Sequence, residues 1–152
     1  MKESSSVKQV NAPVERVYAT LSDLNNLRPI IERAQNDETL KEKMREAGQG
    51  NALDSLKDVT LTADSLEIPA PMVGTISLRI IEREENKCIK FVTDKSPVNA
   101  NLWIQVLPET ESTSKLKLTI DADIPFMLKA MVGSKIREGI EKVADAIAMI
   151  QY

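Results

Sequence analysis

The side chains that most often carry acid–base and metal chemistry are scarce in this sequence. It contains no histidine, which removes the commonest general base and the commonest zinc ligand. Serine–histidine and cysteine–histidine nucleophile pairs are therefore excluded. From the residue types we identify no catalytic residue, no metal ligands and no cofactor.

Two short patterns have the spacing of a ligand site. Asp121 and Asp123 lie two apart in a predicted strand and so share a face, as carboxylates around a calcium ion can. No third carboxylate stands at ligand spacing, so we expect both on a solvated face. Gly48-Gln49-Gly50 lacks the Lys-Ser/Thr of a phosphate-binding loop, and we interpret it as a helix terminator.

Four isolated side chains each have a binding interpretation and a plainer one. Arg79 and Lys90 lie on the polar side of a predicted hairpin, where they either bind an anionic head group or face solvent. Trp103, the single tryptophan, is either an exposed contact anchor or is covered by a neighbouring loop. We interpret Cys88 as a partly buried structural thiol, with redox chemistry as the alternative.

Length, charge and composition limit the class of protein. With 152 residues and a net charge of −3, we expect one domain spanning residues 1–152. Basic residues are interspersed with acids, so nucleic-acid binding has no electrostatic footprint. There is no apolar run of about 18 residues for a membrane span, and the first residues lack the apolar centre of a secretory signal. A single cysteine excludes an intramolecular disulfide, so we expect a cytoplasmic protein.

The first part of the chain is predicted to hold one strand and three helices. A short strand is expected at Val7–Asn11, followed by a helix that begins at Pro13 and ends at Ser22. A second helix is expected at Leu27–Ala34. A third, Glu38–Ala47, has a thin apolar stripe and belongs on the surface or over an opening, and a loop follows it to Asp58.

From Lys57 the apolar period changes to two, which predicts strands. The phase slips at Asp64-Ser65, where we expect a bulge or a turn. A long strand opens at Gly74 and turns at Glu84–Lys87 into its neighbour. Leu116–Ile124 alternates most clearly. The short connections favour antiparallel pairing with one buried face.

A long helix in Phe126–Tyr152 is predicted to cover that face. Its apolar stripe has a spacing of three or four and comprises Val132, Ile136, Ile140, Val143, Ile147 and Ile150. Gly133 and Gly139 weaken the helix by about 1 kcal/mol each relative to alanine. They either make room for a ligand or a bend, or reflect close packing or a helix that starts only after Gly133.

This order of elements resembles the helix-grip fold of the START-like (SRPBCC) superfamily, which includes lipid-transfer domains and the polyketide cyclase/dehydrase group. The segments VNAPVERVYATLSDLNNL (Val10–Leu27) and GTISLRIIEREENKCIKF (Gly74–Phe91) are similar to the family's opening strand and helix and its central hairpin. The terminal helix matches in position and length. The resemblance implies an α+β fold. A curved antiparallel sheet of six to seven strands would surround the C-terminal helix, with two to three short helices after the first strand.

The resemblance also implies a ligand cavity between sheet and helix, and we assign its lining from the strand alternation and the helix. The candidate ligand-binding residues are Leu27, Ile30, Ile31, Ile76, Leu78, Ile80, Ile89, Phe91, Leu102, Ile104, Leu118, Ile120, Met127, Leu128, Met131 and Val132. Five aromatic residues leave little to fill the interior, and methionines make adaptable linings. The alternative is a fully packed core, which would have the same aliphatic alternation.

Three functions remain open from the sequence. The first is binding, transport or sensing of a hydrophobic or amphipathic small molecule such as a lipid, without transforming it. The second is an enzyme of the polyketide cyclase/dehydrase type, which needs an acid or base inside the cavity. The third is a non-catalytic protein-interaction module with a closed core and an unknown partner.

Overall fold

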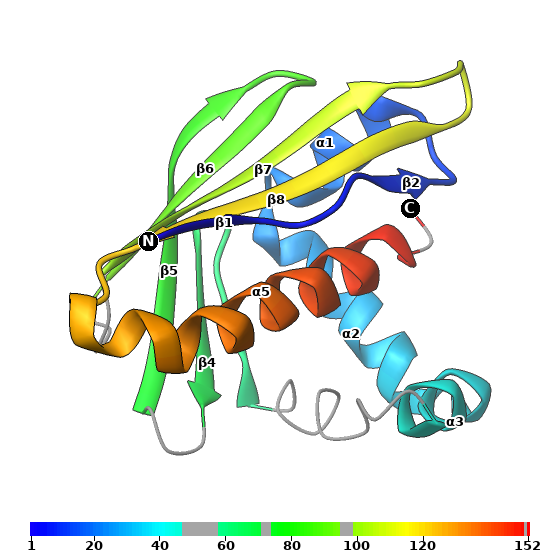
Figure 1. Ribbon diagram of the computed structural model, residues 1–152. Coiled ribbons are helices and arrows are strands. Elements are labelled where there is room, and N and C mark those ends of the chain that lie inside the picture. The colour runs from blue at the N-terminus through cyan, green and yellow to red at the C-terminus, as the bar shows by residue number, and fades with distance from the viewer. Residues whose placement is uncertain (47–57, 71–73, 95–98, 151) are drawn as a thin grey trace.

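The protein is an α+β structure in which a curved, open antiparallel sheet partly surrounds a long C-terminal helix (Figure 1). The computed structural model describes residues 1–46, 58–70, 74–94, 99–150 and 152. The strand order is β1-β8-β7-β6-β5-β4-β3, and β2 also pairs with β8. The helix-grip fold implied by the resemblance is confirmed. None of the described helices is long and apolar enough to cross a membrane.

Two strands, rather than the one predicted, open the chain along β8. They are β1 (Lys2–Ser4) and β2 (Lys8–Val10), both antiparallel to β8. Between them Ser5 continues the pairing, because its backbone N–H donates to the Leu118 carbonyl at 2.8 Å and its hydroxyl accepts from the Leu118 N–H at 3.0 Å. The sequence of β1 is polar, so apolar alternation does not predict this strand.

The predicted helices after the first strands are confirmed with small shifts at their ends. They are α1 (Val14–Leu21), the 3-10 turn η1 (Leu24–Asn26), α2 (Leu27–Asn36) and α3 (Glu38–Glu46). Only α1 buries a full stripe, formed by Val14, Val17 and Leu21. Ala47, Gly48-Gln49-Gly50 and the loop predicted after them lie outside the described residues as far as residue 57.

The predicted phase slip at Asp64-Ser65 is a turn between β3 (Thr60–Leu61) and β4 (Ser65–Ala70). The Thr62 N–H donates to the Ser65 carbonyl at 2.9 Å across it. The remaining strands are β5 (Gly74–Glu84), β6 (Cys88–Thr93), β7 (Ala100–Pro108) and β8 (Ser114–Ala122). The turn at Glu84–Lys87 is confirmed by a 3.0 Å bond from the Lys87 N–H to the Glu84 carbonyl.

The terminal helix α5 (Phe126–Ala148) packs along the edge of the sheet formed by β8, β1 and β2. Its contact stripe is formed by Gly133, Ile140 and Ala144, which are all buried. Val143, which was predicted to belong to that stripe, is instead 47% exposed. The other predicted stripe residues do face the protein: Ile136 and Ile147 pack against the core, and Val132 and Ile150 are half-buried. The helix does not start after Gly133.

Ion pairs fix α5 against the two N-terminal strands. Arg137 Nε lies 3.1 Å from a Glu3 carboxylate oxygen. Lys8 Nζ lies 2.6 Å from Glu141 and 2.8 Å from Asp145. Hydrogen bonds from Lys8 and Ser6 lower the pKa of the Glu141 carboxyl. The charged side chains of α5 therefore bind it to both β1 and β2.

Candidate functional site

The apolar face of the sheet is tightly packed at one end. Five of the predicted ligand-binding residues are there, each at most 5% exposed: Ile80, Ile89, Phe91, Ile104 and Leu118. The α1 stripe and, from α5, Ile140 and Ala144 belong to the same buried cluster. We call this region the closed end. Its side chains contact protein, so a ligand reaches them only if the helices move.

The same face continues toward β4 as a row of half-buried aliphatic side chains. We call it the open apolar face, and it comprises Leu66, Ile68, Ile76, Leu78, Leu102 and Ile120. On β4 and β5 the row is continuous, because Leu66 is opposite Leu78 and Ile68 opposite Ile76, and Phe91 of β6 separates it from Leu102. Leu102 is opposite Ile120 on the other side. The predicted lining lacks Leu66 and Ile68, although their alternation in β4 is a usable signal.

Helix residues around the open apolar face fall into two groups. Val132 and Ile136 of α5 are half-buried, and Ile136 packs against the core. On α2, Leu27 and Ile31 also pack against the core. Ile30, predicted to lie with them at the cavity mouth, instead lines a separate groove beside α1. The structure thus packs Leu27 and Ile31 against the core cluster and separates Ile30 from them.

The first turns of α5 lie in solvent. Met127 is 87% exposed, Met131 69% and Leu128 44%. Gly133 packs against Met1, since a Cβ atom added at this glycine would lie 3.6 Å from the Met1 methyl group, and Met131 lies about 200° around the helix from it. Met131 therefore points away from the sheet edge. The structure does not bring these three side chains onto the open apolar face, so their contact with a ligand stays a prediction.

Among the residues that the structure describes, few polar groups face the open apolar face. Thr93 lies on β6 opposite Leu78, and its hydroxyl oxygen accepts a 2.9 Å hydrogen bond from the Ala100 N–H. Arg83 lies beside the closed end. It donates to the Ser22 carbonyl at 2.9 Å and forms an ion pair with Asp64 at 2.5 Å. Among the described residues, no cluster of three or more metal-ligating side chains exists.

The shifted pKa values also lie away from this face. Among the described groups, those with a resolved shift are Glu3, Lys8, Cys88, Arg137, Glu141 and Tyr152. Four of them form the ion pairs between α5 and the N-terminal strands. Burial raises the pKa of the half-buried Cys88 thiol, with Glu84 and Glu82 adding to the effect, which makes it a poor nucleophile. The described groups with shifted pKa values thus lie outside the open apolar face.

The outer face of the sheet carries the lone tryptophan together with Arg79 and Lys90. Trp103 is half-buried between two ammonium groups, with Lys90 Nζ 5.4 Å and Lys2 Nζ 5.9 Å from the ring centroid. Lysine side chains therefore shield it, which matches neither of the two interpretations, an exposed contact anchor or cover by a neighbouring loop. Arg79 is exposed and pairs with Val92 on this same face. The face is solvated and basic around the ring.

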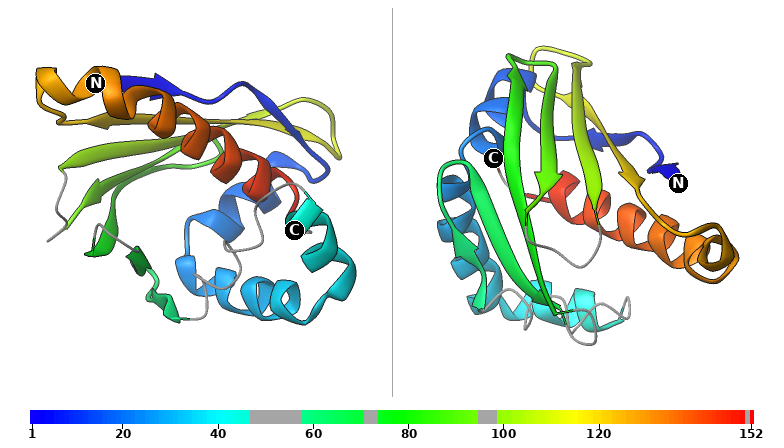
Figure 2. Two further views of the ribbon diagram at one scale, coloured as in Figure 1. Left: turned by 60° about the horizontal axis from the view of Figure 1, so that its bottom comes forward. Right: turned by 90° about the vertical axis from the view of Figure 1, so that its left-hand side faces the viewer.

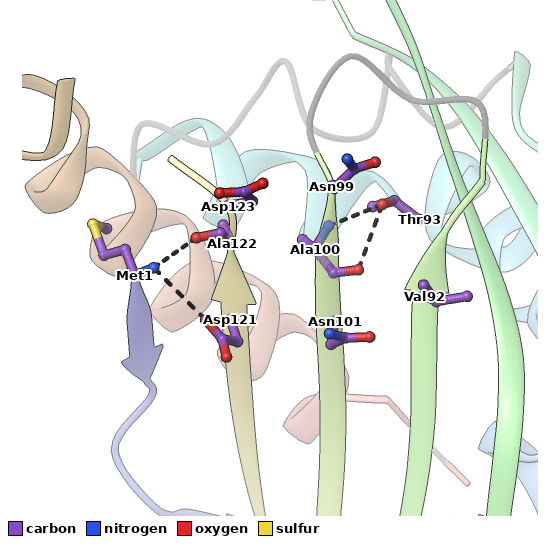
Figure 3. Close-up of a pocket in the computed structure, with 9 residues that line it drawn as sticks. All are labelled: Met1, Val92, Thr93, Asn99, Ala100, Asn101, Asp121, Ala122 and Asp123. Carbon is purple, nitrogen blue, oxygen red and sulfur yellow. Dashed lines mark hydrogen bonds and ion pairs between the residues drawn. The ribbon is translucent and has the colours of Figure 1, made fainter. Parts of the chain in front are cut away.

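A shallow depression of about 380 Å³ lies where β6, β7 and β8 end beside the N-terminus (Figure 3). Its residues are Met1, Val92, Thr93, Asn99, Ala100, Asn101, Asp121, Ala122 and Asp123. The Met1 ammonium donates to the Ala122 carbonyl at 2.6 Å and lies 3.6 Å from Asp121. Residues of both sheet faces line it, and it shares Thr93 with the end of the open apolar face, so it is a notch at the strand ends.

Comparison with known proteins shows the fold. A family model described as "Polyketide cyclase / dehydrase and lipid transport" matches residues 1–148. Norcoclaurine synthase from Thalictrum flavum, in complex with dopamine and hydroxybenzaldehyde, is similar at 14% identity and a TM-score of 0.62, covering 97% of this chain and 85% of that one. The XoxI protein from Bacillus cereus is similar at 16% identity and a TM-score of 0.62, with 97% and 92% covered. A Thermobifida fusca protein is similar at 16% identity and a TM-score of 0.61, covering 97% of this chain and 89% of that one. Comparison with curated protein sequences gives no match.

Proposed function

The chain belongs to the polyketide cyclase/dehydrase and lipid transport family, and on this premise we propose that it binds a hydrophobic or amphipathic small molecule, such as a lipid. The ligand lies on the open apolar face, between the sheet and α5. Transport or sensing of that molecule is the role we assign to the binding. We also propose that residues 1–152 act as one domain and that the protein works in the cytoplasm, where the free thiol of Cys88 stays reduced.

The observation that supports this proposal is the contrast within one continuous apolar face. Ile89 is 1% exposed and Leu118 is fully buried, whereas their neighbours on the open apolar face keep a water-accessible surface. An apolar ligand laid on that row removes this surface from water, which contributes about 25 cal/mol per Å². The sheet contacts of α5 are concentrated on β8, β1 and β2, so the members of this row on β4 and β5 lie outside the main contact of the helix.

Binding without a chemical step is better supported than turnover. A cyclase or dehydrase needs a positioned acid or base, and the described groups with shifted pKa values lie at the helix–strand ion pairs, on the outer face or beside the C-terminus. The fold alone does not carry the activity of norcoclaurine synthase to this chain. The apolar lining therefore favours a binding protein.

A pair of tryptophan variants in β5 tests the proposal. Leu78→Trp fills the open apolar face, whereas Ile81→Trp changes an outer residue that is 45% exposed. We expect the fluorescent probe 1-anilinonaphthalene-8-sulfonate to bind the wild type and Ile81→Trp equally, and Leu78→Trp at least about tenfold more weakly. Native mass spectrometry with lipid extraction should find a bound apolar molecule in the wild type. The proposal would be contradicted if both variants bound the probe equally and the wild type bound no lipid from a broad set.

A further inference from the structure

We propose that a second groove, between α1 and α2, binds the anionic head of an amphipathic molecule, a carboxylate or a phosphate, between Arg16 and Arg33. The groove has a volume of about 290 Å³ and is lined by Arg16, Ala19, Thr20, Asn26, Pro29, Ile30, Arg33 and Tyr152. We call it the arginine groove. It shares no residue with the open apolar face and stands independently of the function proposed above.

The walls of the arginine groove are facing stripes of two connected helices. On α1, Arg16, Ala19 and Thr20 have the spacing of one helical face. On α2, Pro29, Ile30 and Arg33 do the same. The two helices meet at a corner where the Asn26 amide donates to the carbonyls of Ala19 at 3.3 Å and Thr20 at 3.4 Å. These hydrogen bonds hold the two helices together at the corner, and the helices diverge from it (Figure 2).

The side chains that line the groove carry a net positive charge from its two arginines. Among the described residues, Arg33 has no hydrogen bond or ion pair, and the contact of Arg16 is a 3.5 Å bond to the Tyr152 carbonyl. No aspartate or glutamate side chain is among the lining residues. Elsewhere Arg83 and Arg137 each hold a carboxylate. The arginine groove therefore has two guanidinium groups available for an anion from outside.

The Tyr152 side chain closes the third side and is uncharged. Its hydroxyl donates to the Ile147 carbonyl at 2.8 Å, and burial raises the pKa of the phenol well above its ordinary range. The ring is therefore neutral at physiological pH and offers an apolar edge. Together with Ile30 and Pro29 it gives the groove an apolar wall beside the two arginines.

These features define the class of ligand. Guanidinium groups recognise carboxylate and phosphate oxygens by paired, charge-assisted hydrogen bonds. The apolar wall accommodates a short hydrocarbon segment, and the volume is at the small end for ligand sites. An amphipathic anion with a compact head and a short chain therefore fits, whereas a neutral apolar molecule leaves both arginines unpaired.

The test is a titration followed by amide chemical shifts of the full-length protein. The probes are n-hexyl phosphate, inorganic phosphate and hexan-1-ol. We expect n-hexyl phosphate to shift the amides of Arg16–Thr20 and Ile30–Arg33 saturably, inorganic phosphate to bind more weakly, and hexan-1-ol not to shift them. Equal affinity for inorganic phosphate would overturn the amphipathic assignment and leave a free-anion site.

Matched variants assign the binding to the two arginines. Arg33→Ala and Arg16→Ala should each weaken n-hexyl phosphate binding about tenfold, and the double variant should abolish it. Arg28→Ala is the control, because Arg28 is exposed on the same helix and is absent from the groove lining. Unchanged thermal unfolding would show that the variants are folded. Wild-type affinity in the double variant, or shifts confined to Leu78 and Leu102, would overturn the proposal.

The same experiment separates this site from the open apolar face. Leu78→Trp, which fills the open apolar face, should leave the shifts at Arg16 and Arg33 unchanged. If it abolishes them, the anion binds with the apolar ligand and the arginine groove is not a separate site. Failure of the lipid-binding proposal would leave the n-hexyl phosphate titration unaffected.

Discussion

The closed and open ends of the apolar sheet face have the same residue types but different covering. Phe91 and Ile89 at the closed end are at most 2% exposed, whereas Leu78 and Leu102 at the open end are half-buried. The difference comes from the helices, because α1 and the C-terminal half of α5 pack over the closed end. The N-terminal half of α5 follows the edge strand β1, as the contact of Gly133 with Met1 shows. Placement of a helix, rather than strand composition, decides where an apolar face stays accessible.

The largest expected effect comes from truncating the same residue type at each end. Leu118→Ala removes a fully buried side chain and should lower the free energy of unfolding by about 2–5 kcal/mol, because it leaves a cavity that the packed neighbours cannot fill. Leu78→Ala should cost about half of that or less, because its side chain already contacts water. Urea unfolding of both variants measures the difference. Equal losses would mean that the open end is as tightly packed as the closed one.

A buried hydroxyl at the closed end should have the next largest effect. Ser114 is fully buried, and its hydroxyl donates to the Ala12 carbonyl at 2.9 Å. Ser114→Ala leaves that carbonyl unsatisfied and should cost about 1–3 kcal/mol of unfolding free energy.

Thr113→Ala is its control in the same strand region, because the partners of Thr113 lie in an exposed turn. The two variants can be compared by thermal unfolding. If Thr113→Ala loses as much stability as Ser114→Ala, the result would contradict the tight packing assigned to the closed end.

The sequence predicts the sheet better than it predicts the site. Leu116, Leu118 and Ile120 alternate with polar residues, so the apolar side of β8 follows from its period of two. That period is identical for Ile89 and Ile76, and their different burial depends on distant helices. The same limit applies to Met131, because the sequence does not show that Gly133, on nearly the opposite side of the helix, is the residue that packs against Met1.

A glycine in α5 offers a smaller effect of the opposite sign. At Gly139 an added Cβ meets nothing within 4 Å, so Gly139→Ala should stabilise the helix by about 1 kcal/mol. Binding of 1-anilinonaphthalene-8-sulfonate should not change, because no neighbouring atom is displaced. A variant that is more stable but loses the probe would show that Gly139 makes room for a ligand, the alternative left open by the sequence. Denaturant unfolding and the probe titration measure the two quantities.

The smallest expected effect concerns the ion pairs that hold α5 at the sheet edge. Lys8 and Ser6 lower the pKa of the Glu141 carboxyl below its ordinary value of 4.5. A carboxyl whose pKa is lower in the folded state stabilises the protein above its unfolded pKa and loses that contribution as the pH falls through the folded value.

Glu141→Gln should therefore be slightly less stable than the wild type at neutral pH, and the difference should vanish at an acid pH below the folded-state pKa of Glu141. Glu138→Gln is the control, because Glu138 is exposed on the same helix. Urea midpoints at both pH values give the comparison. Because Glu141 pairs with β2 and not with β4 or β5, loss of this acid-sensitive contact should weaken only the packing of α5 on the edge formed by β8, β1 and β2. If 1-anilinonaphthalene-8-sulfonate binding responds to acid equally in both variants, the contact at Glu141 is separate from the open apolar face. A loss of probe binding in Glu141→Gln alone would show instead that the position of α5 controls the open apolar face.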